Sequence, residues 1–517
     1  MSKDPVSFIE RYEKTLIAAG LTAVVCVTVL FFSNKILFIT QDLGRHLMNG
    51  RLFFERHVII PSNYYSYTEP DFPAITHHWG AGVIFYAVYL AGGFVGLSVF
   101  FILLQAAAVL FFIGAARRSA DWWSSLLAAV AAMPLIALRA DIRPEVFTTL
   151  FLGATWYILA RVRDGSLAKN RLYLLPFVQL AWVNTHIFFP LGIFCMACFT
   201  ADAFLERRDI RVYLTAMLCV IGACFMNPFG WRGVKEPFLI FKEYGYMVAE
   251  NQSVPFMWRR FGSAEYLHFG ILCVFFAVLA ILALARRRGA RLRVETALAL
   301  VCGIAAWRVN RCIAQFGFVM IPACAAGLQA ALDGSSRPVR SLAKGLSIAA
   351  VACGLILNFT PQTGYASVWS GRKGIGLLDD AGASARFFTS QGLRGPIFNN
   401  YDIGGYLIFY LFPGERPFVD NRPEAYSVPF LKDVYVAMQE NEGSWKKYDD
   451  LYRFNAIYFF RNDMTPWAQP FLIRRIADDA WAPVYVDAFT IILLRRTAAN
   501  AGVIRKYELP RSLFVAS

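Results

Sequence analysis

The densest group of polar side chains in this sequence lies in residues 40–78, directly after the first long apolar run. Asp42 and His46 are four residues apart, so they share one face if the segment is helical, and Arg45 stands beside them. A carboxylate next to an imidazole and a guanidinium can act as a general base toward a hydroxyl group, or can hold a substrate or a metal ion. The alternative is that this segment only caps a helix and anchors the chain at an interface.

Two adjacent histidines, His77 and His78, end the same segment. They point to different sides of a helix, so at most one of them faces the same site as Asp42. Asp42, His46 and His78 are the residues that would hold a divalent metal, but their spacing is not diagnostic of a metal site. We therefore assign no cofactor and leave a metal ion open. The apolar stretch that follows, residues 80–93, is short for a span and either lies along an interface or forms part of a bent span.

A second polar group, LRADIRPE, contains Arg139, Arg143 and Glu145 between two apolar runs. Charges at the boundary of a membrane are costly unless they are paired or face water. The group is therefore either a structural set of ion pairs or a binding site for an anionic head group, and the sequence favours neither.

A third group, WRVNRC, places Arg308 and Arg311 three residues apart, which predicts one helical face. Guanidinium groups suit phosphate oxygens, and the alternative is anchoring by cation-π contact with Trp307. His186, in WVNTHIFFPLG, falls at the turn between two short apolar runs. It is either a buried interface residue or a further member of a site.

The elements that must position these residues are apolar helices. The chain has 517 residues, of which 57% are hydrophobic and only 17% charged, and this composition excludes an ordinary soluble globular protein. We predict about eleven spans, many of them with uncertain ends, from the apolar runs Thr15–Phe38, Phe94–Ala115, Trp122–Ala137, Val146–Leu159, Leu172–Val183, Ile187–Phe204, Val212–Phe225, Leu267–Ala285, Val294–Trp307, Ile313–Leu332 and Leu346–Phe359.

The net charge of +15 comes from basic clusters that separate these runs. Clusters of this kind set membrane topology and do not indicate nucleic-acid binding, so we exclude nucleic acid as a partner. Alternate connections are basic and agree with the N-terminal Lys3, Arg11 and Lys14. This pattern predicts a multi-pass membrane protein with a cytoplasmic N-terminus and a C-terminus outside, in the periplasm if the membrane is a bacterial inner membrane, as we expect, or in the lumen in a eukaryote.

Two domains follow from this division. Residues 1–358 form a transmembrane domain whose first outer loop is 40–78, and residues 359–517 form a periplasmic α/β or α+β domain. AIYFF near Ile457 predicts a strand, and VYVD with TIILL around Asp487 predicts a hairpin. The tail has no P-loop or GxGxxG fingerprint. Asp420 and Arg422 are explained by a salt-bridged turn after a strand.

The predicted topology brings all three polar groups to the outer face, beneath the C-terminal domain. An acidic residue near outer arginines and histidines is what an enzyme with a lipid-phosphate-linked donor requires. A transporter of lipid-linked sugars is the alternative, but such proteins commonly show repeated halves and charges in mid-membrane, which this sequence lacks. A glycan ligase or polymerase with a lipid-diphosphate donor is a second alternative.

Several motifs resemble those of the GT-C superfamily of integral membrane glycosyltransferases, especially bacterial members related to the protein mannosyltransferase and aminoarabinose transferase group. The resemblance covers most of the chain in order and rests on QDLGRHLMNGRLF, SYTEP with HHWG, RPEVFT, WVNTHIFFPLG, NPFGW and NNYDIGGYLIFYLFPGERPFVDNRPEAY.

This resemblance implies a GT-C-like fold and transfer of a hexose or pentose from a polyprenyl-phosphate sugar to a lipid, glycan or protein acceptor, among membrane lipids. It also implies that the acidic residue of the first outer loop, here Asp42, is catalytic. Substrate contacts would then come from Arg45, His46, His77, His78, Arg139, Arg143, Glu145, His186, Arg308 and Arg311. Where the mannosyltransferases have an adjacent Asp-Glu pair, this chain has Asp42 followed by Leu43, which leaves the base and any metal requirement open.

Overall fold

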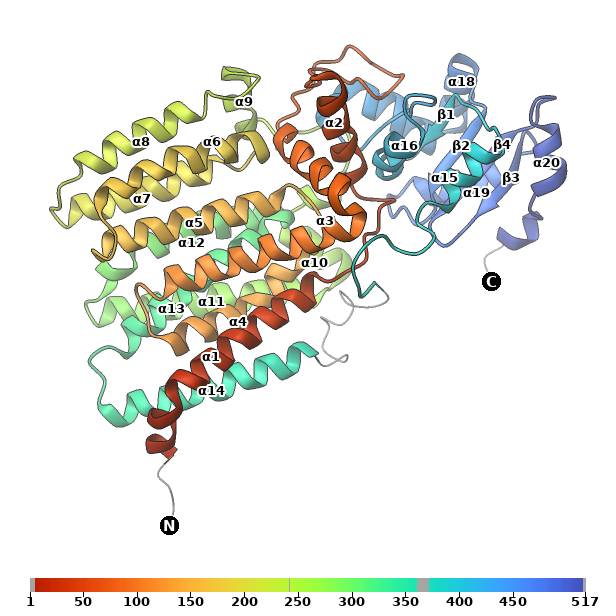
Figure 1. Cartoon of the computed structure of the whole chain (residues 1–517). Helices are drawn as coiled ribbons and strands as arrows, with labels where there is room; N and C mark the ends of the chain where they lie inside the picture. The colour runs from red at the N-terminus through yellow and green to blue at the C-terminus, as the bar shows by residue number, and fades with distance from the viewer. Residues whose placement is uncertain (1–4, 241, 360–371, 515–517) are drawn as a thin grey trace. The chain divides into compact units, whose positions relative to one another are not determined.

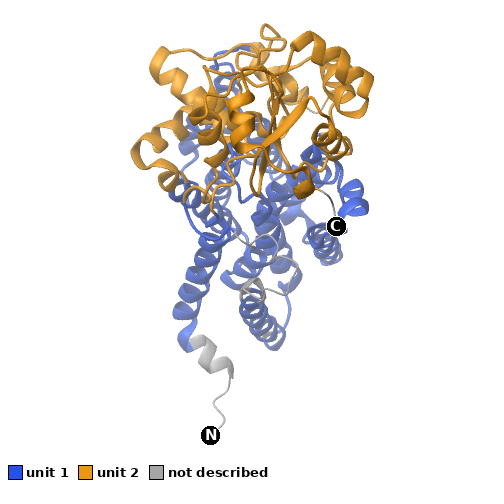
Figure 2. Ribbon diagram, turned by 90° about the vertical axis from the view of Figure 1, so that its right-hand side faces the viewer, with its two compact units in different colours: residues 1–34, 98–230, 248–375 blue, residues 35–97, 231–247, 376–517 orange. Residues whose placement is uncertain are grey.

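The computed structural model describes residues 5–240, 242–359 and 372–514. The chain folds into two compact units, coloured separately in Figure 2. Unit 1 comprises residues 1–34, 98–230 and 248–375, and unit 2 comprises residues 35–97, 231–247 and 376–517. Each unit is therefore assembled from three separate stretches of the chain.

Unit 1 is a bundle of apolar helices. They are α1 (Pro5–Phe32), α4 (Trp122–Ile136), α5 (Glu145–Arg163), α6 (Leu175–Thr185), α7 (Pro190–Leu205), α8 (Arg211–Ala223), α10 (Val254–Phe261), α11 (Ala264–Ala285), α12 (Arg293–Arg308), α13 (Ile313–Leu332) and α14 (Arg337–Phe359). Helix α13 packs against α4, α11 and α12, and its residues from Ile313 to Gly327 are buried. It is the core of the bundle, and in Figure 1 α1, α4 and α14 lie side by side, as do α5, α6 and α7.

Five helical segments among the described residues are long and apolar enough to cross a membrane, namely Arg11–Phe32, Trp79–Ala116, Trp122–Arg139, Ala264–Ala285 and Asn310–Leu332. These apolar helices are those of a multi-pass membrane protein. Each of the eleven predicted runs contains a helix, but several helices are shorter than a span, so the number eleven stays a prediction.

Helix α3 (Trp79–Ala116) begins in unit 2 and ends in unit 1. It is bent at Gly93, whose φ of 58° is accessible to glycine at no steric cost. Residues 80–93 are therefore helical up to a kink at Gly93, and whether they lie along the interface or form part of a bent span stays a prediction.

Unit 2 contains a small sheet flanked by helices. The strands are β1 (Ile397–Asn399), β2 (Ala456–Phe460), β3 (Trp481–Val486) and β4 (Thr490–Arg495), in the order β1-β2-β4-β3. β1 pairs parallel with β2, whereas β2–β4 and β3–β4 are antiparallel. The predicted strand near Ile457 and the predicted hairpin are confirmed, and β1 is an addition.

The helices of unit 2 are α2 (Leu43–Arg56), α9 (Trp231–Lys235), α15 (Ala383–Ser390), α16 (Gly404–Leu411), α17 (Ala437–Glu440), α18 (Glu442–Tyr452), α19 (Ala468–Ala477) and α20 (Ala501–Tyr507). An aromatic core built around Phe398, Phe418 and Trp445 includes residues of α17, α18 and α19. Most of this core comes from the C-terminal segment, as an α+β domain there requires.

Residues 35–97 pack as part of this C-terminal fold. Thr68 Oγ1 donates a hydrogen bond of 2.6 Å to the carbonyl oxygen of Phe418, and Tyr67 Oη donates one of 2.8 Å to that of Ile397. Glu69 accepts hydrogen bonds from the backbone and hydroxyl of Ser427. The compact units therefore divide the chain differently from the segments 1–358 and 359–517. The division at residue 358 describes which part of the chain lies in the membrane and which part lies outside it, and it stays a prediction.

Candidate functional site

Asp42 occupies the N-cap position of α2, but its side chain accepts no capping hydrogen bond. Its Oδ2 atom lies 3.2 Å from His46 Nε2 and 3.6 Å from Arg45 Nη2. The Asp42 side chain is 20% exposed, whereas that of His46 is fully buried. The shared helical face predicted for Asp42 and His46 is confirmed. Helix capping does not explain Asp42, because its carboxylate is directed to the two neighbouring side chains.

Glycines fix the helix that carries this carboxylate. A Cβ atom at Gly44 of α2 would collide with the carbonyl oxygen of Gly405 on α16, and one at Gly50 would collide with that of Gly82 on α3. The backbone of α2 therefore touches the backbones of two other elements, on either side of His46. This close packing leaves Asp42 little freedom to move relative to α16.

A buried ion pair lies in the same unit, in the turn FVDNRP. Arg422 donates to both carboxylate oxygens of Asp420, at 2.8 and 2.7 Å, and to Asn63 Oδ1 at 3.0 Å. Asp420 is fully buried and Arg422 is 5% exposed. The salt-bridged turn that the sequence predicts is confirmed, and its contact with Asn63 ties the first loop to the C-terminal segment.

The histidines of the first loop lie close to one another. The His78 ring is 5.5 Å from that of His46 and 4.1 Å from that of His77, and His77 Nδ1 lies 3.1 Å from the carbonyl oxygen of Ile75. Within residues 5–240, 242–359 and 372–514, no group of three or more His, Cys, Asp or Glu side chains is arranged to hold a metal ion. Asp42, His46 and His78 thus do not form such a group, and we derive no step through a metal.

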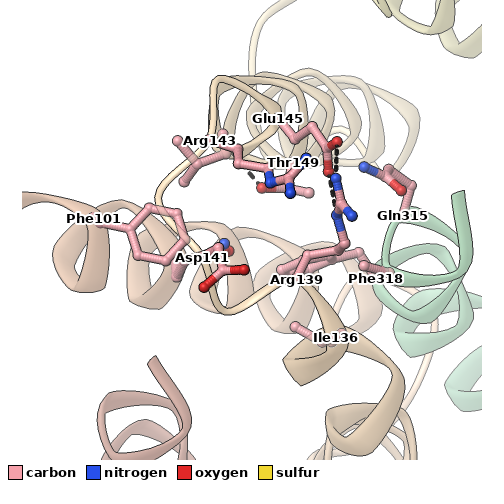
Figure 3. Close-up of a pocket in the computed structure, with 12 residues that line it drawn as sticks. Phe101, Ile136, Arg139, Asp141, Arg143, Glu145, Thr149, Gln315 and Phe318 are labelled. Carbon is pink, nitrogen blue, oxygen red and sulfur yellow. Dashed lines mark hydrogen bonds and ion pairs between the residues drawn. The ribbon is translucent and has the colours of Figure 1, made fainter. Parts of the chain in front are cut away.

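A second polar cluster lies in unit 1 and is drawn in Figure 3. Arg139, at the end of the short helix η1 (Ala137–Arg139), holds both oxygens of Glu145 with its guanidinium fork, and its Nε to Oε2 distance is 2.9 Å. A further carboxylate joins them, because Glu250 Oε1 lies 3.1 Å from Arg139 Nη1 and 2.8 Å from Arg143 Nη1. Glu250 was missed from the sequence, since it is an isolated acid in a long loop with no pattern around it.

The ion pairs strongly favour the charged form of Glu250. Burial raises its pKa, but the guanidinium groups of Arg139 and Arg143 outweigh burial and lower the pKa to about 2. The ion pairs expected if the LRADIRPE segment has a structural role are therefore present. An anionic ligand would have to compete with Glu250 for the same two guanidinium groups.

A small pocket beside these ion pairs is also lined by Gln105 and Gln315. Both glutamines are at least 95% buried, at 4% and 3% exposure, and the Oε1 atoms of both have no hydrogen-bond partner among the described residues. Figure 3 shows Gln315 close to Arg139. Neither glutamine was predicted from the sequence, because each stands alone within an apolar run.

Arg308 and Arg311 do not share one helical face, so that prediction is wrong. Helix α12 ends at Arg308, which is exposed, and Val309 is extended with φ −138° and ψ 101°. Arg311 lies in the following short helix η6 (Asn310–Cys312), and its guanidinium is 6.0 Å from the ring centroid of Phe188. Of these two arginines, only Arg311 lowers the pKa of Glu250, so it lies near the ion pairs of Arg139 and Arg143.

His186 is 4% exposed and follows α6. Its Nδ1 atom lies 2.7 Å from Thr148 Oγ1, which also accepts a hydrogen bond of 2.9 Å from Trp182 Nε1. These contacts are those of a buried histidine within the helix bundle. Its role as a site residue stays a prediction.

The predicted site residues thus fall into two sets. Unit 2 holds Asp42, Arg45, His46, His77 and His78, and unit 1 holds Arg139, Arg143, Glu145, His186, Arg308 and Arg311. The structure brings together most members of each set. Convergence of the two sets on one face stays a prediction.

Replacing Glu250 by glutamine is expected to destabilise unit 1 by roughly 1–2 kcal/mol at pH 7, since two guanidinium groups lose one shared carboxylate. The folded-state pKa of about 2 lies below the ordinary value of 4.5, so the stabilisation is complete above about pH 4.5 and is lost as the pH falls toward 2. Thermal melts of the purified protein at several pH values measure this. The matched control is Glu265→Gln, whose carboxylate has no ion pair among the described residues. Equal melts of the two variants at pH 7 would contradict the prediction.

Solved structures resemble nearly the whole chain. The archaeal oligosaccharyltransferase AglB from Archaeoglobus fulgidus, in complex with an inhibitory peptide and a dolichol-phosphate, matches with a TM-score of 0.60 at 12% identity, over 92% of this chain and 74% of its own. ArnT from Cupriavidus metallidurans bound to undecaprenyl phosphate matches with a TM-score of 0.52 at 13% identity, over 94% and 98%. No family model and no curated protein matches the sequence. At these identities the likeness shows a shared fold.

Proposed function

Because this chain has the fold of AglB and ArnT, which are membrane glycosyltransferases of the GT-C superfamily, we propose that it transfers a sugar from a polyprenyl-phosphate-linked donor to an acceptor hydroxyl. The observation that carries the proposal is Asp42. Its carboxylate is partly exposed at the start of α2, does not cap the helix, and is held by Arg45 and a buried His46.

The proposed reaction is a displacement at the anomeric carbon. The acceptor oxygen forms a bond to that carbon while the bond from the carbon to the phosphate oxygen breaks. The phosphate leaves with the bonding electron pair, and the carboxylate of Asp42 takes the proton of the acceptor hydroxyl. Attack from the side opposite the leaving group inverts the configuration of the sugar.

The arginines of unit 1 are proposed to hold the phosphate of the donor. Arg139, Arg143 and Arg311 all act on Glu250, so three cations surround one carboxylate there. A phosphate oxygen suits the same guanidinium groups, and the glutamines that line the pocket add hydrogen-bonding capacity. Arg308 is exposed and forms no ion pair with the described residues of this cluster, so we propose only that it attracts the anionic lipid.

The transferred group is proposed to be a hexose or a pentose, and the acceptor a lipid, a glycan or a protein. AglB was solved with a dolichol-phosphate and ArnT with undecaprenyl phosphate, which supports a polyprenyl-phosphate carrier here. A transporter of lipid-linked sugars would also use the arginines, but it has no need for a general base. Asp42 therefore favours the transferase.

The test is turnover of the donor. Purified protein in lipid vesicles is given polyprenyl-phosphate hexose and polyprenyl-phosphate pentose, and release of polyprenyl phosphate is followed together with the new glycoside. Turnover that requires the protein supports the proposal. Movement of intact donor across the vesicle without cleavage would favour the transporter.

We also propose that the chain lies in the bacterial inner membrane with its N-terminus in the cytoplasm and its C-terminus in the periplasm, as the basic connections predict. A periplasmic alkaline phosphatase fused after residue 517 is then expected to be active, and a fusion at the N-terminus inactive. A cytoplasmic reporter at the same two ends is the control and should give the opposite pattern. An inactive alkaline phosphatase after residue 517 would mean that the predicted number of spans is wrong by an odd number.

A further inference from the structure

Glu424 is a second carboxylate in the part of unit 2 that packs against the start of α2. It lies in the short helix η9 (Pro423–Ala425), two residues after Arg422. Nothing in the sequence separates it from the salt-bridged turn before it. Its surroundings in the folded unit are different from those of Asp420.

The two glycines of α16 join this turn to the Asp42 segment. A Cβ atom at Gly405 would lie 2.9 Å from the carbonyl oxygen of Gln41 and 3.4 Å from Asn421 Nδ2. A Cβ atom at Gly404 would collide with the backbone of Asp420. Residues 420–421 and residue 41 therefore all lie close to Gly404 or Gly405, and this places the turn next to Asp42.

Asp420 stabilises the turn by pairing with Arg422. It is fully buried and takes both hydrogen bonds of the Arg422 fork. Glu424, by contrast, is partly exposed and forms no ion pair within the described residues. A second acid in a turn whose arginine is already satisfied adds nothing to the ion pair.

Arg45 connects Glu424 to the candidate site. Among neighbouring charges, Arg45 acts most strongly on Glu424 and Arg422 acts next, against the effect of burial, which raises the pKa of Glu424. The same Arg45 lies 3.6 Å from Asp42 and is only 6% exposed. Its Nε atom has no hydrogen-bond partner among the described residues. A buried guanidinium donor left over beside two carboxylates indicates a polar ligand.

The charges indicate which ligand. Asp42 and Glu424 carry two negative charges and Arg45 one positive charge, and Asp420 and Arg422 cancel each other. The net negative charge disfavours an anionic group at this place. Carboxylates accept hydrogen bonds from hydroxyl groups and a guanidinium donates to hydroxyl oxygens, so neighbouring hydroxyl groups satisfy all three side chains.

We propose that Glu424 and Arg45 bind hydroxyl groups of a neutral carbohydrate acceptor and so position the reacting hydroxyl toward Asp42. This inference rests on the proposed glycosyl transfer and narrows its acceptor to a sugar. Glu424 is a positioning residue in this scheme, since it acts on the acceptor and takes no proton from the reacting oxygen.

The test compares two acceptors with the full-length protein and a polyprenyl-phosphate hexose donor. Octyl glucoside offers adjacent hydroxyl groups, whereas 1-octanol offers only one. The wild type is expected to have a kcat/KM for the glucoside at least about tenfold above that for octanol, and Glu424→Gln is expected to lose about tenfold of this preference, mainly through a higher KM for the glucoside. Glu440→Gln, an exposed glutamate of α17 in the same unit, is the matched control and should keep the preference.

The possible outcomes are distinct. A wild type without preference for the glucoside, or a Glu424→Gln variant that keeps the preference, overturns the inference while the proposed function stands. Absence of any donor turnover, water included as acceptor, overturns the proposed function itself. Folding is checked by thermal melts at pH 7. Glu424→Gln is expected to melt at or above the wild-type temperature, because burial raises the pKa of Glu424 and so disfavours its charged form in the folded protein.

Discussion

Asp42→Asn is expected to lower the kcat for sugar transfer by about 10²–10⁴-fold, which is the usual contribution of a general base. Asparagine has nearly the same size and shape as aspartate but cannot take the proton of the acceptor hydroxyl. The side chain is 20% exposed and makes no capping bond that the fold depends on, so the variant should still fold and insert into the membrane. Release of polyprenyl phosphate by purified protein in vesicles measures the loss, with a thermal melt as evidence of folding.

The matched control is Asp71→Asn, an exposed aspartate in the same loop. It should transfer sugar at the wild-type rate, because it changes the same functional group away from Arg45 and His46. Transfer retained in a folded Asp42→Asn protein would remove Asp42 from its catalytic role. A large loss in both variants would mean that the loop is sensitive to any change, and the assignment of the base would fail.

Gly44→Val is expected to destabilise unit 2 by about 3 kcal/mol or more. Even the first carbon of a side chain at Gly44 would overlap the carbonyl oxygen of Gly405, and a backbone oxygen cannot turn away as a flexible side chain can. The helix itself would tolerate valine, since glycine is the poorer helix former. The loss therefore comes from the separation of α2 from α16, and it should also abolish transfer because Asp42 moves with α2.

Limited proteolysis and thermal melts of the purified protein measure this effect. Gly502→Val serves as control, because Gly502 lies on helix α20 of the same unit and a Cβ atom there would meet nothing within 4 Å. The control should melt close to the wild type. If the two valine variants melted alike, the close contact between α2 and α16 would not be what holds the Asp42 segment in place.

The parts of this fold that follow a local pattern were predictable from the sequence. Long apolar runs predict helices, and the two short apolar runs around Asp487 predict the hairpin of β3 and β4, because both signals lie within a few neighbouring residues. The motifs also supported a GT-C resemblance, which the matching structures confirm for the fold. Asp42 and His46 share a face for the same local reason, the periodicity of a helix.

Features that depend on distant parts of the chain were not predictable. Thr68 and Phe418 are joined by a hydrogen bond, but nothing near either residue in the sequence indicates the other. Glu250 and Glu424 are single acids whose importance comes from arginines that are far away in sequence. The error over Arg308 and Arg311 is of the same kind, since spacing assumed a continuous helix and Val309 interrupts it.

The assembly of unit 2 from three stretches of chain has a consequence for how the protein is made. Asp42 leaves the ribosome roughly 380 residues before Glu424, and at ~5–20 residues per second this is a delay of about 20–80 s. During that time the loop 35–97 lacks Phe418, Ile397 and Ser427, the partners of its Thr68, Tyr67 and Glu69. A nascent chain that stops in the middle of synthesis would therefore carry the acidic residue without the framework that orients it. The segment that carries Asp42 therefore gains its packing partners only once the last 140 or so residues have been made.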